Sequence, residues 1–184
     1  SFTLVIPSLT WVNTTFPWSK SETADIFKWK GKKMKDDLNV YDKKLEPCST
    51  QGMAKTGYTR EGSCFTLPND RGRHHICIDL QNAKGFCPST GQNWCDDEDP
   101  CDADPSKKCG IKNWCVCEWA FARYVENNVG PLEDCPKIQC DAVNKKVIQH
   151  YKEHLEEPGV SKALDCIIKS CHLPKTTHSH VTDS

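Results

Sequence analysis

The chain has 184 residues, and its 24 Lys and Arg against 25 Asp and Glu give a formal net charge of −1. That balance argues against a nucleic-acid-binding domain, which carries a basic excess on one face. No apolar run approaches the roughly 18 residues that a membrane-spanning helix needs. The 13 cysteines all fall within residues 48–171. Such a density indicates a disulfide scaffold made in an oxidising compartment, with a cytosolic metal-cluster protein as the alternative.

Residues 1–37 contain no cysteine and are predicted to form an extended N-terminal arm. Their apolar runs are rich in β-branched and aromatic residues and are interrupted by prolines, which is typical of short strands. An extended arm exposes the apolar side chains of Phe2, Leu4, Ile6, Trp11, Val12 and Phe16. Because a lone monomer would not leave this surface in water, we expect the arm to add a strand to a neighbouring copy, which produces a ring or a filament. The alternative is that the arm covers the core of its own domain.

The N-terminal region also indicates the compartment. The chain begins at Ser1 without Met and without a signal pattern, as a secreted protein does after signal cleavage. Asn13-Thr14-Thr15 is the only Asn-x-Ser/Thr acceptor triplet of the sequence. Together with the cysteines, it predicts an extracellular glycoprotein with a glycan on a solvent-facing Asn13.

Residues 38–140 are predicted to form a cysteine-rich body. Gly, Pro, Asn and Asp recur every few positions there, so strands should be short and loops long. An alternating pattern would place Cys115, Cys117 and Trp119 on one face of an extended segment. Residues 118–125 favour a helix, with Gly130-Pro131 as a stop signal soon after it.

Residues 141–173 are predicted to form a helical hairpin packed on the body. The first helix runs from Asp141 through Glu157, with one apolar stripe of Val143, Val147, Ile148, Tyr151 and Leu155. Pro158-Gly159 breaks it, the second helix runs from Ser161 to about Cys171, and residues 174–184 form a polar tail. The predicted fold class is therefore α+β: a small disulfide-rich domain with short strands, long loops and a C-terminal helical hairpin, plus an extended N-terminal arm.

The cysteines predicted to form disulfides are Cys48, Cys64, Cys77, Cys87, Cys95, Cys101, Cys109, Cys115, Cys117, Cys135, Cys140, Cys166 and Cys171. Because 13 is odd, at most six intrachain bridges form, and one thiol is left for an intermolecular bridge or a free, buried state. The spacing leaves the connectivity open. A helix rise of 1.5 Å per residue places Cys171 near Cys140 and Cys135, whereas Cys166 should bond the body.

The segment 95–105 carries six acidic residues and no basic one. Two oxygen pairs, Asp97 with Asp99 and Asp102 with Asp104, are of the kind that binds calcium. The segment lacks the Gly and the distal Glu of an EF-hand loop. A solvated acidic loop, or one that meets a basic surface, is therefore the favoured alternative, and no other cofactor is predicted.

Histidine and cysteine side chains also offer ligands for zinc, but none has the paired C-x-x-C spacing of structural zinc sites. His75 is interpreted as a hydrogen-bonded or surface histidine, and His178 and His180 as adventitious ligands at most. Cys77 with His75 would be a nucleophilic pair, which a disulfide at Cys77 would abolish. We therefore expect no enzymatic activity.

Several stretches between Asn39 and about Leu155 resemble a bacterial family known as a domain of unknown function, numbered twenty-two thirty-seven. They are Asn39-Val40, Leu45-Glu46-Pro47-Cys48-Ser49, residues 56–64 (TGYTREGSC), residues 70–77 (DRGRHHIC) and residues 114–119 (WCVCEW). The resemblance implies a small α+β domain whose shared cysteines correspond to Cys48, Cys64, Cys77, Cys115 and Cys117. It implies no activity. The acidic segment 87–109, the arm, the second C-terminal helix and the tail depart from the family pattern.

These observations favour a secreted structural protein that assembles with copies of itself, binds no nucleic acid and does not span a membrane. The first alternative is a secreted binding module for a small ligand, a glycan or calcium. The second is a redox or metal-dependent enzyme of the parent family.

Overall fold

The computed structural model describes residues 37–174. The predicted assembly arm (Phe2, Leu4, Ile6, Trp11, Val12 and Phe16), the glycosylation site Asn13 and the tail histidines lie outside the described residues. Within residues 37–174, no helix is long and apolar enough to cross a membrane.

Two short antiparallel strand pairs form the sheets. Strand β1 (Ile76–Asp79) pairs with β4 (Asn113–Val116), with Cys77 opposite Cys115. This pair is central because Ile76 and Ile78, spaced by two residues, are both fully buried. Strand β2 (Glu98–Pro100) pairs with β3 (Lys108–Gly110) in a more exposed hairpin.

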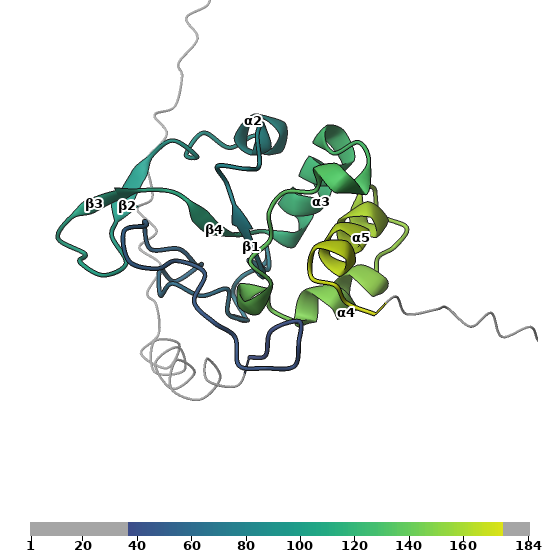
Figure 1. Cartoon of the computed structure of the whole chain (residues 1–184), viewed down its shortest axis with the longest axis horizontal. Helices are drawn as coiled ribbons and strands as arrows, with labels where there is room; N and C mark the ends of the chain where they lie inside the picture. Colours follow the sequence, from purple (N-terminus) through teal and green to yellow (C-terminus); the bar gives the residue numbers. More distant parts are fainter. Residues whose placement is uncertain (1–36, 175–184) are drawn as a thin grey trace, which may run out of the picture. The chain divides into compact units, whose positions relative to one another are not determined.

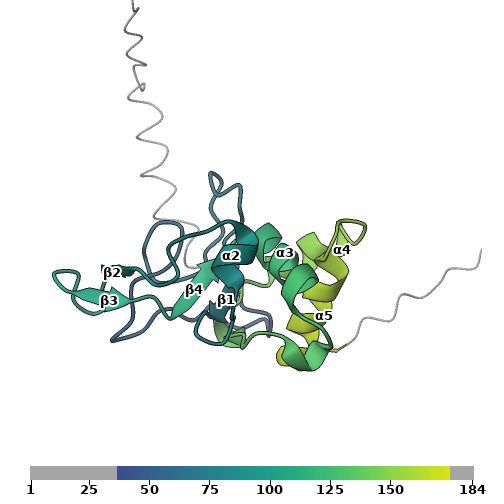
Figure 2. The same cartoon turned by 90° about the horizontal axis from the view of Figure 1, so that it is seen from above.

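The helices are α2 (Phe86–Thr90), α3 (Glu118–Asn128), α4 (Lys146–Lys152) and α5 (Val160–Ser170), with 3-10 turns at Leu132–Asp134 and Cys140–Ala142. Figure 1 shows the β1–β4 pair between the β2–β3 hairpin and the helices α3, α4 and α5, and Figure 2 shows the same order from above. The predicted class, a small α+β domain with short strands and C-terminal helices, is confirmed.

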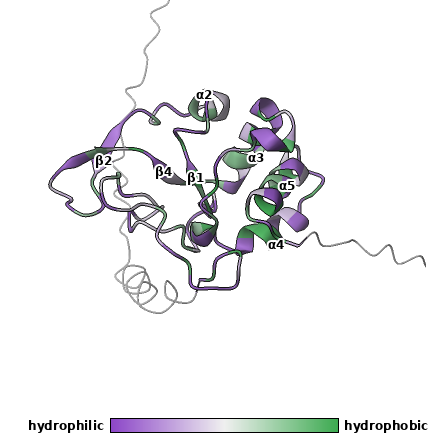
Figure 3. Ribbon diagram, in the orientation of Figure 1, coloured by the Kyte–Doolittle hydropathy of each residue, from purple (hydrophilic) through white to green (hydrophobic). Residues whose placement is uncertain are grey.

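The apolar core lies mainly among the helices. Helix α5 turns Ala163, Leu164 and Ile167 inward at helical spacing. Figure 3 shows hydrophobic residues along α4 and α5, whereas β2 is hydrophilic. Helix α5 comes so close to α3 that a Cβ added at Gly159 would lie 2.3 Å from the carbonyl oxygen of Ala122. Only glycine fits there.

The predicted helix from Asp141 through Glu157 is too long. The structure has a 3-10 turn at Cys140–Ala142 and an α-helix only at Lys146–Lys152. The reason is tertiary, because the backbone N–H of Asn144 donates to the carbonyl of His75 on the body rather than to its own segment. The buried Asn144 side chain also donates to the carbonyl of Cys64.

The predicted alternation across Trp114–Trp119 also needs correction. Strand β4 ends at Val116, and Cys117 precedes the first residue of α3. Trp119 therefore lies on a helix and not on a strand face with Cys115. The helix predicted over residues 118–125 is confirmed and extends to Asn128.

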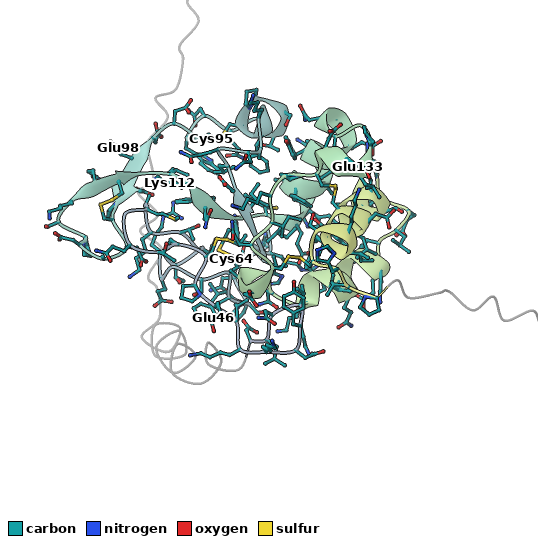
Figure 4. All side chains as sticks on the ribbon, in the orientation of Figure 1. Glu46, Cys64, Cys95, Glu98, Lys112 and Glu133 are labelled. Atoms are coloured by element: carbon teal, nitrogen blue, oxygen red, sulfur yellow. A yellow bond between two sulfur atoms is a disulfide. The ribbon has the colours of Figure 1, made fainter. Side chains whose placement is uncertain are left out.

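Six disulfides cross-link the domain: Cys48–Cys77, Cys64–Cys115, Cys87–Cys95, Cys101–Cys109, Cys135–Cys166 and Cys140–Cys171. Cys171 pairs with one of the two partners that helix geometry allowed. Figure 4 shows Cys64 close to the central strands and Cys95 beside α2. The thirteenth cysteine, Cys117, is free.

Candidate functional site

The free thiol of Cys117 lies at the junction of β4 and α3. Cys117 is the N-cap of α3 in an extended conformation, so the first amides of the helix point toward it. Burial raises the pKa of the Cys117 thiol above its usual value, and the backbone N–H groups of Ala120 and Trp119 at the start of α3 offset part of this rise. The carboxylates of Asp70 and Glu118 add to the rise. The resting group at neutral pH is therefore the protonated thiol.

His74 and Asp70 belong to the tight loop that precedes β1. The Nδ1 atom of His74 lies 2.7 Å from Oδ1 of Asp70, and Oδ2 of Asp70 accepts the backbone N–H of His74 at 2.7 Å. The Asp70 side chain is 1% exposed, and that of His74 is 31% exposed. Burial by itself would raise the pKa of Asp70, but hydrogen bonds from His74 and the nearby imidazoles hold it below its usual value.

Gly72 brings the histidine and the thiol together. A Cβ built on Gly72 would lie 3.0 Å from Cε1 of His74 and 3.2 Å from Sγ of Cys117. The imidazole and the sulfur therefore approach the same point, which the missing side chain leaves open. Cys117, His74 and Asp70 supply a nucleophile, a base and a carboxylate that orients the base.

A groove of about 740 Å³ opens beside these residues. Cys117 and His74 line it together with the aromatic rings of Tyr58, Trp94 and Trp114. The indoles of Trp94 and Trp114 have centroids 5.4 Å apart, and the ring of Tyr58 lies 5.7 Å from that of His74. Such a wall offers flat apolar faces to a ligand.

One polar pair lies within the same groove. The guanidinium of Arg60 lies 4.8 Å from the ring centroid of Trp114 and pairs with Oδ2 of Asp99 at 3.3 Å. Arg60 and Asp99 both line the groove. The site therefore combines aromatic faces with a donor and an acceptor, as small-molecule sites usually do.

A second cluster joins His75, Glu118 and His150. Nδ1 of His75 lies 2.7 Å from Oε1 of Glu118, and Nδ1 of His150 lies 3.1 Å from the same oxygen. The three donor atoms lie within 4.8 Å of one another, and two imidazoles with one carboxylate are ligand types of zinc. The hydrogen bonds already satisfy the fully buried carboxylate. His75 is thus a buried, hydrogen-bonded histidine, in line with its interpretation from sequence.

The candidate pair Cys77 with His75 is excluded by the geometry. Cys77 forms a disulfide with Cys48, so it has no thiol to act as a nucleophile. His75 instead faces Glu118.

The four aspartates predicted as calcium ligands do not share a site. Asp99 pairs with Arg60, the Asp102 carboxylate accepts the hydroxyl of Ser49, and the Asp104 carboxylate accepts Ser106 and pairs with Lys107. Asp97 lines the groove. Among residues 37–174, none of the four belongs to a group of three metal-capable side chains. Since the carboxylates have different partners, the calcium prediction has no geometric support.

Sequence reasoning missed the Cys117, His74 and Asp70 set. Two signals were present: the odd cysteine count and the spacing of Asp70, Gly72 and His74 in one short loop. Neither signal says that this loop packs against residue 117, which is 43 positions beyond His74. That contact is created by the pairing of β1 with β4.

Comparison with known families gives one match. The model of a family described as "Uncharacterized protein conserved in bacteria (DUF2237)" covers residues 38–157, which include the loop with His74, both central strands and Cys117. Comparison with curated proteins finds no significant match. Since the family model spans more than half of the sequence, this chain is a member of the DUF2237 family.

Proposed function

We propose that this protein is a secreted, disulfide-stabilised binding protein whose aromatic groove takes a small ligand with a ring-shaped face, such as a sugar. The six disulfides indicate an oxidising environment. Secretion to the extracellular space is the compartment that fits both these bonds and the acceptor triplet at Asn13.

The observation that carries the proposal is the composition of the groove wall. Tyr58 is 50% exposed and lines the groove together with Trp94. Aromatic rings with a polar tip provide contact area at low entropic cost, and the Arg60–Asp99 pair supplies hydrogen bonds that orient a ligand. These features favour a polar ligand with one apolar face.

The test is titration of the full chain with a panel of mono- and oligosaccharides, followed by tryptophan fluorescence and calorimetry. Tyr58→Ala should weaken binding at least tenfold. Tyr41→Ala is the matched control, because Tyr41 is also exposed, at 38%, but does not line the groove. Equal affinities of the two variants, or no saccharide bound by the intact protein, would refute the proposal.

Self-assembly through residues 1–16 is a second candidate function, favoured by one further surface. A groove of about 830 Å³ is lined by the partly buried apolar residues Val40, Ile148, Ile168 and Leu173, with lysines at its rim. This surface suits an apolar strand, and its proposed occupant is the arm of a neighbouring copy.

Light scattering on the full chain tests this second candidate. Both deletion of residues 1–16 and Ile148→Glu should convert an oligomer to a monomer, whereas Lys152→Glu at the rim should have a smaller effect. An intact protein that is monomeric at high concentration, or a truncated one that still assembles, would exclude the arm as the connector.

A further inference from the structure

We propose that Cys117, His74 and Asp70 form a nucleophilic thiol site that takes an acyl group from an ester or thioester entering the aromatic groove. The inference extends the proposed function, since the acylated ligand must enter the same groove. It contradicts the sequence-based expectation that the chain has no enzymatic activity.

The roles follow from the hydrogen bonds. Nδ1 of His74 is committed to the carboxylate of Asp70 at 2.7 Å, so Nε2 is the nitrogen available to accept a proton. The Cys117 sulfur lies against the same glycine as the imidazole. Because burial keeps the sulfur protonated, it requires a base at the moment of attack. We assign that role to His74, whose Cε1 and the sulfur lie 3.0 Å and 3.2 Å from the same point, a Cβ built on Gly72. Asp70 is a positioning residue.

The N-terminus of α3 completes the site. Cys117 is the N-cap of the helix, and the backbone N–H groups of Trp119 and Ala120 favour the negative charge that develops as the thiol proton leaves. Helix α3 has 11 residues, so its terminus is a well-formed source of such donors. The thiol thus lies at the start of a helix and beside the loop that carries His74.

Acyl transfer to Cys117 followed by hydrolysis needs water as its only co-reactant. The Cys117 proton moves to Nε2 of His74 while an Sγ–C bond forms at the carbonyl carbon. The C–O or C–S bond to the leaving group then breaks, and the departing alcohol or thiol takes the proton from His74. Water, deprotonated by His74, releases the carboxylic acid and restores the thiol. No electron transfer is involved.

Disulfide exchange is the less suitable chemistry for this thiol. The other twelve cysteines are all paired in six disulfides, so Cys117 has no free resolving partner in the chain. A raised thiol pKa also lowers the thiolate fraction on which exchange depends. Acyl transfer with a general base does not need a standing thiolate.

The experiment uses p-nitrophenyl acetate with the full chain, recording release of p-nitrophenolate and the acetylated mass of the protein. We expect one acetyl group, located on Cys117 by peptide mapping, and none on Cys117→Ala. His74→Gln should slow acetylation by roughly 100-fold, whereas His172→Gln, an exposed histidine outside the groove, should leave the rate unchanged.

Two further variants separate chemistry from folding. Gly72→Ala adds a methyl group 3.0 Å from Cε1 of His74 and 3.2 Å from the Cys117 sulfur and should slow acetylation at least tenfold with all six disulfides intact. Asp70→Asn should slow acetylation, because the carboxylate that orients the imidazole is lost, and the conservative Asp70→Glu should restore part of the rate. Acetylation on another residue, or an unchanged rate in folded His74→Gln, would overturn the proposal.

The outcome is independent of sugar binding. Acetylation is recorded by mass without any saccharide present, and Tyr41→Ala, whose ring does not line the groove, should be acetylated at the rate of the intact protein. Acetylation of Cys117 without saccharide binding would refute the proposed function alone. Saccharide binding without acetylation would refute only the nucleophilic site.

Discussion

Helices α3, α4 and α5 bury large apolar side chains, among them Phe121, Val125, Tyr151 and Ile167. The segment from Cys48 to Val116 has only two short strand pairs and one short helix, and it contains four of the six disulfides. A small second cluster of buried residues consists of four half-cystines of this segment and Ala142 from the 3-10 turn Cys140–Ala142. The difference teaches that the two regions resist unfolding by a different balance of means. Apolar burial contributes more in the helical region, which holds two disulfides, and covalent cross-links contribute more in the segment from Cys48 to Val116, which holds four.

Removal of Cys64–Cys115 should have the largest effect. Its partners are 51 residues apart, so the double replacement by alanine should cost about 4 kcal/mol by freeing the unfolded chain. The matched control is Cys101–Cys109, with a separation of 8 and a position in the exposed hairpin, which should cost about 2.5 kcal/mol. Urea denaturation measures both, and equal losses would contradict the role of loop length.

A cavity in the helical region should come next. Ile167 is fully buried, and Ile167→Ala should cost about 3 kcal/mol through lost burial and the cavity that remains. Its neighbour Ile168 is only partly buried, so Ile168→Ala should cost clearly less. If both variants lost the same stability in urea denaturation, apolar burial would not be what stabilises α5.

Gly159→Ala should destabilise the contact of α3 with α5 by about 2 kcal/mol. Gly159 has φ +78, and an added Cβ would lie 2.3 Å from the carbonyl oxygen of Ala122. Gly91 is the control, with φ +73 but no atom within 4 Å of an added Cβ, so its alanine variant should show only the backbone penalty of about 1 kcal/mol. Thermal denaturation distinguishes the two.

Acid should lower the free energy of unfolding in part through Asp70, which belongs to the loop before β1. The folded-state pKa of Asp70 is lowered, so its carboxylate contributes stability that is present above the unfolded pKa of about 3.9 and is lost as pH falls through the folded value. Urea midpoints at pH 5 and pH 3 should therefore differ less in Asp70→Asn than in the intact protein. A difference as large in the variant would assign the acid sensitivity to other carboxylates.

Much of the fold follows from local signals. The helix after Cys117, the break at Pro158-Gly159 and the second helix of the hairpin are readable from apolar spacing and from stop residues, because those signals act within a few positions of the chain. The helix predicted from Asp141 failed because the amide of Asn144 bonds His75, a partner that local spacing cannot reveal.

The cysteine count by itself predicted a disulfide-linked domain in which at least one cysteine has no intrachain partner, since a disulfide needs two cysteines and 13 is odd. Only the tertiary structure decided which thiol remains. The pairing of β1 with β4 places Cys77 opposite Cys115. It also brings the loop that contains Asp70 and His74 to the start of α3. Cys117 therefore lies beside this loop and remains a free thiol. Local spacing could not reveal this, because a contact between segments about 43 positions apart depends on how the strands pair.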